Sequence, residues 1–348
     1  MARARLLAVV APALLVLAAC GSVASPESSG SSSSSKHPVE DGAFPVTVDH
    51  KYGTTTVKKA SERIVVVGLK EQDDLLALGE VPVATTKWLD DTAGGIYPWA
   101  KERLGDAKTP QLLNQDDGVQ VEKVAALRPD LIIGLYAGMT KGEYETLSKI
   151  APTVAQPGDV PDYGISWQQE ALTVGKAVGK PQAAKDLIDD VEAKVAKIAD
   201  ANPSLDGREA LFASPYEGTY VYGSTDPRTR FLTDLGMRIP ADIDKVVGTK
   251  EFGANISPER VDFLDVDALV WLADEGKERD TVLGNKAYTG LGVHRDGRDV
   301  FIGNTDQYGL AISFVTALSV PYTMERLAPQ LSAAVDGRAS TKVPNVKD

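Results

Sequence analysis

Aromatic residues follow several of the strands that this sequence predicts, and rings at such places are suited to holding a ligand. In α/β proteins, ligands bind beyond the carboxyl ends of parallel strands. Rings with a few polar groups suit a large, partly apolar molecule. Each ring alone is as compatible with core packing as with ligand contact, but as a set they predict one cleft. The residues concerned are Trp88, Tyr136, Tyr216, Trp271 and Tyr308.

Signatures of catalysis are absent from the sequence. The three histidines, His37, His50 and His294, are scattered in a tether, beside a turn and in a polar loop, which makes a poor metal site and a poor triad. There is no nucleophile elbow, no P-loop and no dinucleotide-binding glycine motif after a strand. The many carboxylates fit a solvated acidic surface better than an acid–base pair. We therefore expect a protein that binds and does not catalyse, with no metal ligands of its own and no cofactor.

A long amphipathic helix is predicted over residues 181–201, near the middle of the chain. Its apolar residues recur at gaps of three and four, which puts them on one face. Pro181 suits the first turn, and Asn202-Pro203 ends the run. A helix of this length is a rod of about 30 Å, roughly the width of a small domain. The apolar stripe consists of Ala184, Leu187, Ile188, Val191, Val195 and Ile198.

A repeat lies on either side of this helix. Residues 119–134 and 256–271 match position by position at one constant offset, and Glu122 in the first copy corresponds to Glu259 in the second. Each copy predicts a short helix, a turn and a buried strand of a parallel sheet. The expected fold is therefore α/β, with two three-layer, Rossmann-like lobes of mainly parallel sheet bridged by the long helix.

Length and composition agree with a two-domain globular protein. The chain has 348 residues, of which 43% are hydrophobic and 25% charged. Its net charge of −12 argues against nucleic acid as a partner. The expected divisions are a signal peptide at 1–20, a serine-rich tether at 21–43, an N-terminal lobe at 44–164, a helical linker at 165–205 and a C-terminal lobe at 206–348.

The N-terminus has the pattern of a secretory signal. Arg3 and Arg5 precede an apolar run that is too short to span a bilayer comfortably. The end of this run, Leu17-Ala18-Ala19-Cys20, resembles a bacterial lipoprotein box, which implies cleavage before Cys20 and lipidation of its sulfur. Two acyl chains give stable anchoring. The alternative is a plain signal peptide with a chance cysteine. We expect a protein anchored by lipid on the extracytoplasmic face of the bacterial cell membrane.

Residues 45–335 resemble a known family. The motifs that carry the resemblance are 64–79 with Asp73 to Gly79, 121–133 with Arg128 to Ile133, 231–236, 257–261 and 297–302. Their order, with the lipobox before them and the long helix between them, resembles the substrate-binding lipoproteins of bacterial ABC importers in the iron-siderophore and vitamin B12 group (periplasmic binding protein class III). The resemblance implies two rigid lobes joined by one helix, a ligand cleft and delivery of cargo to a membrane permease.

The resemblance also implies a docking role for one glutamate on each lobe, which would meet arginines of the permease. The matching positions are Glu122 and Glu259, the pair that the repeat relates. Each stands in a predicted first helical turn, where the helix dipole favours a carboxylate even without a partner.

Ligand contacts are implied less specifically. Lys87-Trp88 matches a tryptophan-bearing loop of hydroxamate-siderophore binders, and Lys87 would favour anionic or oxygen-rich cargo. Asn114 stands where an arginine often follows the third strand, so recognition of hydroxamate oxygens by an arginine is in doubt there. Tyr136, Phe252 and Tyr308 fall near other aromatic positions of that family, and Tyr222 is a further candidate because it ends a predicted strand of the second lobe.

The resulting hypothesis is a monomeric lipoprotein that captures a ferric siderophore between its lobes and passes it to an ABC permease, with the iron held by the siderophore. A haem or corrinoid binder of the same fold is the main alternative, because Tyr136 and Tyr222 could offer an axial ligand. The histidine positions disfavour a binder of free zinc or manganese. A surface-anchored hydrolase would need a serine or a carboxylate pair in the cleft, and a tethered adhesion module would have a closed interlobe surface.

Overall fold

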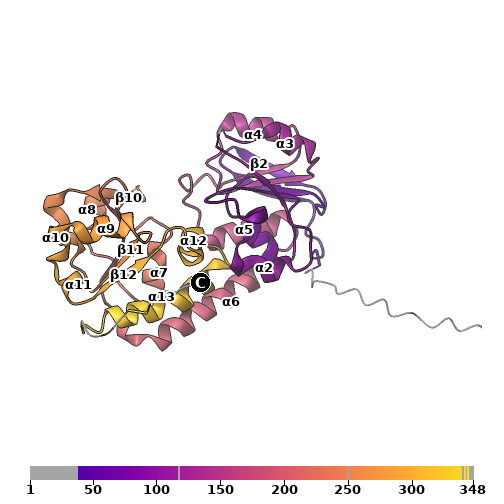
Figure 1. The fold of residues 1–348 in the computed structure, drawn as a ribbon. Coiled ribbons are helices and arrows are strands. Elements are labelled where there is room, and N and C mark those ends of the chain that lie inside the picture. The colour runs from indigo at the N-terminus through magenta and orange to yellow at the C-terminus, as the bar shows by residue number, and fades with distance from the viewer. Residues whose placement is uncertain (1–37, 117, 250, 339–340, 342, 345–348) are drawn as a thin grey trace, which may run out of the picture. The chain divides into compact units, whose positions relative to one another are not determined.

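The computed structural model describes residues 38–116, 118–249, 251–338, 341 and 343–344 (Figure 1). The expected signal peptide, most of the tether and Cys20 lie outside the described residues. Within the described part of the chain, no helix is both long enough and apolar enough to cross a membrane.

The first lobe is built on a five-stranded parallel sheet in the order β5-β4-β3-β6-β7. Strands β3, β4, β6 and β7 are buried throughout, as expected for a parallel sheet covered on both faces. A separate antiparallel hairpin, β1-β2, precedes the sheet. The elements are β1 Val46–His50, β2 Gly53–Val57, β3 Ile64–Val66, α1 Gln72–Ala77, β4 Ala84–Thr86, η1 Ala93–Gly95, α2 Pro98–Leu104, β5 Gln111–Leu113, α3 Val121–Ala126, β6 Leu131–Gly134, α4 Lys141–Leu147 and β7 Thr153–Ala155.

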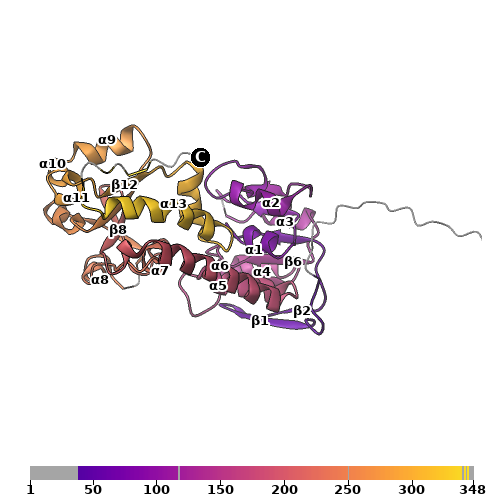
Figure 2. The same cartoon turned by 90° about the horizontal axis from the view of Figure 1, so that it is seen from below.

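Two consecutive helices, α5 Trp167–Ala177 and α6 Pro181–Ala201, connect the lobes, and the short 3-10 helix η2 Pro203–Leu205 follows. Helix α6 has the predicted bounds and passes from the first lobe to the second (Figures 1 and 2). Its Ala184 packs into a hydrophobic cluster of the first lobe, whereas Ile188, Val191 and Val195 pack into the main cluster of the second. One apolar stripe therefore serves both cores, which explains how a single helix bridges them.

The second lobe is built on a mixed five-stranded sheet in the order β10-β9-β8-β11-β12. Strands β8, β11 and β12 are parallel, while β9 runs antiparallel to both β8 and β10. The elements are β8 Ala210–Ser214, β9 Thr219–Tyr222, α7 Thr229–Asp234, α8 Ile243–Val247, β10 Gly253–Ile256, η3 Pro258–Leu264, β11 Ala268–Leu272, α9 Lys277–Gly284, α10 Lys286–Thr289, α11 Gly292–Arg295, β12 Asp299–Ile302, α12 Gln307–Phe314 and α13 Ser319–Ala334.

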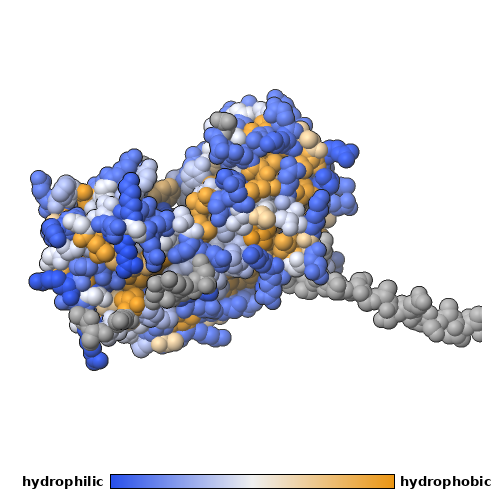
Figure 3. Space-filling model, viewed as in Figure 1, coloured by the Kyte–Doolittle hydropathy of each residue, from blue (hydrophilic) through white to orange (hydrophobic). Residues whose placement is uncertain are grey.

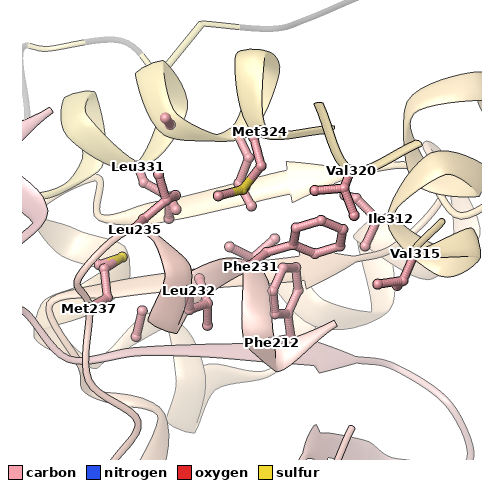
Figure 4. Packing of buried hydrophobic residues seen from close by; sticks show 14 of the residues in the cluster. Phe212, Phe231, Leu232, Leu235, Met237, Ile312, Val315, Val320, Met324 and Leu331 are labelled. Carbon is pink, nitrogen blue, oxygen red and sulfur yellow. The ribbon is translucent and has the colours of Figure 1, made fainter. Parts of the chain in front are cut away.

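The core of the second lobe forms where helices cover the sheet. Figure 4 shows the rings of Phe212 from β8 and Phe231 from α7 next to Val320 and Met324 of α13, and all four are buried. On the outside, Figure 3 shows hydrophilic residues over most of the face, with hydrophobic residues gathered over part of the first lobe. Burial of the apolar residues between layers is the main force that holds this lobe together.

The two α/β lobes, their largely parallel sheets and the bridging helix confirm the predicted fold class. The lobe boundaries at 164 and 206 stay predictions. The two copies of the repeat differ in detail, since α3 is an α-helix whereas its counterpart η3 is a 3-10 helix with a kink at Arg260.

Local backbone features set the bounds of α12 and α13, the last two helices of the described residues. Helix α12 begins at Gln307 because the side chain of Asp306 accepts a hydrogen bond from the Gly309 N–H and so caps the helix there. It ends at Phe314 because Val315 has a left-handed backbone conformation. Helix α13 then begins at Ser319, and Pro321 lies in its first turn, where proline is tolerated.

Candidate ligand-binding site

A cavity of about 130 Å³ lies between the lobes, and both lobes line it. The first lobe contributes three rings, two of which follow strands β4 and β6. The second lobe contributes an ion pair, an aromatic ring and two small residues. The lining residues are Trp88, Tyr136 and Tyr163 from the first lobe side and Asp226, Pro227, Arg228, Phe252 and Ser313 from the second.

The rings of the first lobe support one another around this cavity. Trp88 lies 5.6 Å from Tyr136 and 4.9 Å from Phe314 of the second lobe, measured between ring centroids. Tyr163 packs edge-on against Tyr136 at 5.1 Å. Burial raises the pKa of Tyr136, although the nearby Lys70 charge opposes this. Tyr136 therefore remains a neutral phenol, and the rings offer faces for an apolar part of a ligand.

Arg228 is the guanidinium of the site. Its Nε donates to Asp226 Oδ1 at 2.8 Å and one Nη donates to Asp226 Oδ2 at 2.7 Å. The guanidinium lies 4.1 Å from the centre of the Tyr222 ring, within the range of a cation–π contact. Burial opposes its charge, but the Asp226 carboxylate raises the pKa of Arg228 overall. The guanidinium is thus charged and held in place by two hydrogen bonds, and its other N–H groups remain to donate to a ligand.

The backbone beneath Tyr136 is held by a buried carboxylate. Glu71 Oε1 accepts hydrogen bonds from the backbone N–H groups of Leu135 and Tyr136, the latter at 2.7 Å. A Cβ on Gly68 would lie 1.9 Å from Glu71 Oε1, so only glycine leaves room for this carboxylate. Local sequence after β3 therefore fixes the place of the ring that follows β6.

A buried polar junction joins the lobes below the cavity. The Lys70 ammonium lies 4.4 Å from the centre of the Tyr136 ring and 2.9 Å from Glu170 Oε2 of α5. It also donates to the carbonyl oxygen of Val315 in the second lobe at 3.2 Å. Lys70 and Glu170 are almost completely buried. Burial opposes the charged form of Lys70, but neighbouring carboxylates, Glu170 foremost, raise its pKa.

Asp73 makes a second connection across this junction. Its Oδ2 accepts from Thr316 Oγ1 of the second lobe at 2.6 Å and from Trp99 Nε1 at 2.7 Å. Burial raises the pKa of Asp73 to about 6, although these two hydrogen bonds oppose the shift. The adjacent Asp74 is also buried, and burial raises its pKa.

Three of the residues expected to contact a ligand, Trp88, Tyr136 and Phe252, are brought together at the cavity. A fourth, Tyr222, makes the cation–π contact with the Arg228 guanidinium. That these residues contact a ligand stays a prediction, and their position at the cavity supports it.

The other expected contact residues lie outside the lining. Lys87 is paired with Asp91 at 2.8 Å, and the Asn114 side chain donates to Asp116 at 2.5 Å. Tyr308 is buried in the second-lobe core, where its hydroxyl donates to Gln330 at 2.9 Å. Tyr216 is 64% exposed beside Tyr220.

Trp271 lies in the second-lobe core and borders a different cavity. That cavity, of about 410 Å³, is enclosed within the second lobe between the β8-β9 turn, η3, α9 and α10. Glu217, Val261 and Tyr288 also line it. It is larger than the interlobe cavity, but residues of one lobe alone form it.

Asp226 and Arg228 were missed by reasoning from the sequence. The rule that ligands bind at the carboxyl ends of parallel strands drew attention to Tyr216 and Trp271. Strand β9 is antiparallel to β8, so its carboxyl end lies at the opposite edge of the sheet. The loop that carries Arg228 follows β9. The adjacent Asp226-Pro227-Arg228 sequence after a predicted strand was the available signal.

Glu122 and Glu259 are exposed and stand in the first turns of α3 and η3, as the repeat predicts. Within the described residues, no group of three or more histidine, cysteine, aspartate or glutamate side chains is placed to hold a metal ion. The site therefore offers rings and an ion pair to a ligand.

Two curated bacterial proteins are similar to this chain in sequence. The chain is 29% identical over 200 residues to the Fe(3+) dicitrate-binding periplasmic protein FecB of Escherichia coli (strain K12), which covers 57% of this chain and 64% of that protein, less than two thirds of its length. It is 28% identical over 277 residues to the probable siderophore-binding lipoprotein YfiY of Bacillus subtilis (strain 168), covering 77% of this chain and 79% of the relative.

Solved structures extend the similarity to most of the fold. A periplasmic solute binding protein from Mycobacterium smegmatis str. MC2 155 is 34% identical with a TM-score of 0.75, covering 83% of this chain and 98% of that one. PiaA of Streptococcus pneumoniae TIGR4, in complex with ferrichrome, is 28% identical with a TM-score of 0.73, covering 84% and 99%. The family model described as periplasmic binding protein matches residues 64–291, more than half of the chain. The chain belongs to the periplasmic binding protein family.

Proposed function

We propose that this protein binds a ferric siderophore in the interlobe cavity and delivers it to an ABC permease. The observation that carries the proposal is the joining, at one cavity, of the first-lobe rings Trp88 and Tyr136 to the fixed guanidinium Arg228 of the second lobe. Two similar proteins support it: a relative named as a probable siderophore-binding lipoprotein, and PiaA, whose structure was solved in complex with ferrichrome. The function is binding, and the siderophore supplies every ligand of the iron.

Each wall of the cavity has a part in this binding. The rings of Trp88 and Tyr136 pack on the apolar surface of the chelate. Arg228 donates to its oxygen atoms, and Asp226 keeps the guanidinium in place. Sites for small molecules commonly enclose roughly 300 to 1,000 Å³. The interlobe cavity, of about 130 Å³, is smaller, so the groups that line it have to rearrange to admit a chelate.

Haem is the weaker candidate for this site. Tyr136 lines the cavity and carries a hydroxyl, which a haem iron would bind as the phenolate. Burial raises the pKa of Tyr136 and so disfavours the phenolate. The neutral ring fits contact with a preformed chelate better.

Replacing Trp88 or Arg228 should weaken cargo binding strongly. We expect Trp88→Ala and Arg228→Gln each to raise the Kd for the bound ferric siderophore by about tenfold to a hundredfold, since a buried ring or a charge-assisted hydrogen bond contributes roughly 1 to 3 kcal/mol. Calorimetric titration measures this. Tyr216→Ala, which removes an exposed ring outside the cavity, is the matched control and should bind as the parent does. Equal affinities for all four proteins would refute the assigned site.

The proposed delivery step uses the exposed pair Glu122 and Glu259. The corresponding positions on two related lobes suit a receptor with two-fold pseudosymmetry, and each carboxylate is exposed to meet an arginine. A lipid on Cys20 would keep the monomeric protein beside the permease on the extracytoplasmic face, with the serine-rich tether giving reach.

The double variant Glu122→Ala, Glu259→Ala should lose uptake and keep cargo binding. We expect transport of radioactive iron as the siderophore chelate to fall at least about tenfold in cells, because docking loses two charged contacts. The Kd of the purified variant should match the parent. Glu145→Ala with Glu275→Ala removes two other exposed acids and serves as the control, with uptake unchanged. Normal uptake by the first double variant would exclude the docking role.

A further inference from the structure

The charges at the interlobe cavity are balanced. Among its lining residues, the charged side chains are Asp226 and Arg228, and their two short hydrogen bonds make them a neutral pair. The other lining residues are aromatic rings, a proline and a serine. A ligand in this cavity therefore meets no net positive charge from the walls.

The loop of residues 87–92, from which Trp88 lines the cavity, carries an acidic surplus, and we call this loop the rim. Lys87, next to Trp88 in the chain, lies 2.8 Å from Asp91, and this hydrogen bond is the main reason that its pKa is raised. Asp90 and Asp116 also act on the Lys87 charge. One lysine thus faces three aspartates. Because Lys87 is already paired with Asp91, it offers an anionic ligand less attraction than an unpaired lysine would.

The floor of the cavity adds no free cation. Lys70 lies under the Tyr136 ring, but its ammonium pairs with Glu170 at 2.9 Å. Asp73 and Asp74 belong to the same buried junction and interact with the Lys70 charge. While Glu170 is ionised, it neutralises the Lys70 ammonium. Asp73 and Asp74 can then add only negative charge, so the floor is neutral or acidic.

We propose that the site selects ferric siderophores by their charge, binding neutral or cationic trishydroxamate chelates in preference to multiply anionic catecholate or carboxylate chelates. The inference rests on the proposed function and narrows its substrate class. A multiply charged anion that enters this cavity loses its hydration, which costs free energy. The paired cations, the neutral floor and the acidic rim do not compensate for that cost. A neutral chelate of similar size loses little on the same path and keeps the ring contacts. The site therefore discriminates against anionic chelates because its cations are already paired with carboxylates.

Calorimetric titration of the purified full-length protein tests the selection. The probes are ferrichrome as a neutral trishydroxamate, ferrioxamine B as a cationic one, and ferric enterobactin as a trianionic triscatecholate. We expect at least one trishydroxamate to bind about tenfold or more tighter than the triscatecholate. Raising the salt concentration should narrow the difference, because screening weakens the repulsion at the exposed rim.

The variant Asp226→Asn tests the cause. Its amide oxygen can still accept from the Arg228 backbone N–H, which now donates to Asp226 Oδ1 at 2.9 Å, but the guanidinium is no longer neutralised. We expect the triscatecholate to bind about tenfold or more tighter than to the parent, with ferrichrome changed much less. The double variant Asp226→Asn, Arg228→Gln restores the balance of charge and should return the parent's order of preference. Asp189→Asn, on the exposed face of α6, is the matched loss of one acid elsewhere and should alter nothing.

The possible outcomes separate this inference from the proposed function. Tighter binding of the triscatecholate by the parent protein overturns the charge selection and leaves siderophore binding in place. A trishydroxamate preference that Asp226→Asn leaves unchanged overturns the assignment of the charge balance as its cause. Absence of binding by every ferric chelate overturns both.

Discussion

Lys70→Met should lower the free energy of unfolding by about 3 to 5 kcal/mol at pH 8. The substitution removes the ammonium that lies 2.9 Å from Glu170 and that donates to the Val315 carbonyl across the lobe junction. A buried carboxylate that loses its partner keeps its full cost of desolvation, which is the source of losses of this size. Urea denaturation followed by tryptophan fluorescence measures the change.

Two further variants identify the cause of that loss. Lys70→Met with Glu170→Leu removes both charges and should recover a large part of it, because apolar replacements of a buried pair are often tolerated. Lys51→Met breaks an exposed pair with Asp162 and should cost no more than about 1 kcal/mol. If Lys70→Met and Lys51→Met cost the same, the buried junction is not a principal source of stability.

Asp73 should make the protein less stable as the pH rises from about 4 to about 6. Burial raises the pKa of Asp73 to about 6, against an ordinary value of 3.8. Between these two values the folded protein holds a proton that the unfolded chain has released, so the free energy of unfolding falls with increasing pH. Two pKa units correspond to roughly 3 kcal/mol, and the loss is complete above the folded pKa.

Asp73→Asn should remove this contribution. The amide oxygen can take over the hydrogen bonds from Thr316 and Trp99, and no charge develops at the buried site. We expect the variant to match the parent near pH 4 and to be more stable by up to about 3 kcal/mol at pH 7 and above. Denaturation curves across this pH range measure the difference, with the exposed Asp189→Asn as the control. Parallel pH profiles for parent and Asp73→Asn would contradict the assignment.

Both predictions concern contacts that cross from one lobe to the other. Lys70 reaches the Val315 carbonyl, and Asp73 reaches the Thr316 hydroxyl. The same lysine lies under the Tyr136 ring of the cavity. The junction thus helps to fix how the two lobes' contributions to the site lie relative to each other. The buried charges of the junction carry a desolvation cost.

The sequence was sufficient where a local pattern determines the structure. The spacing of Ala184, Ile188, Val191 and Val195 predicted the bridging helix with the observed bounds, since its apolar stripe depends on the helical period alone. The order of strands and helices predicted two largely parallel sheets. In the first lobe, the carboxyl-end rule also placed Trp88 and Tyr136 correctly at one cavity.

The sequence was insufficient where pairing between distant segments decides. The antiparallel run of β9 reverses the edge at which its following loop emerges, so Arg228 could not be placed without the sheet order. The contacts of Lys70 and Asp73 were not predicted, because their partners Glu170 and Thr316 are far away in the chain. Tyr308 appeared available after a strand, yet α12 turns its hydroxyl inward to Gln330.

The most direct test of the central claim is a titration of the purified protein with ferric siderophores and with haem, followed by tryptophan fluorescence. Trp88 lines the proposed cavity, so a bound ferric chelate should quench its emission. We predict saturable quenching with a sub-micromolar Kd for at least one ferric siderophore, and a smaller response in Trp88→Ala. Binding of haem alone, with a new absorption band and no response to any siderophore, would contradict the proposed function.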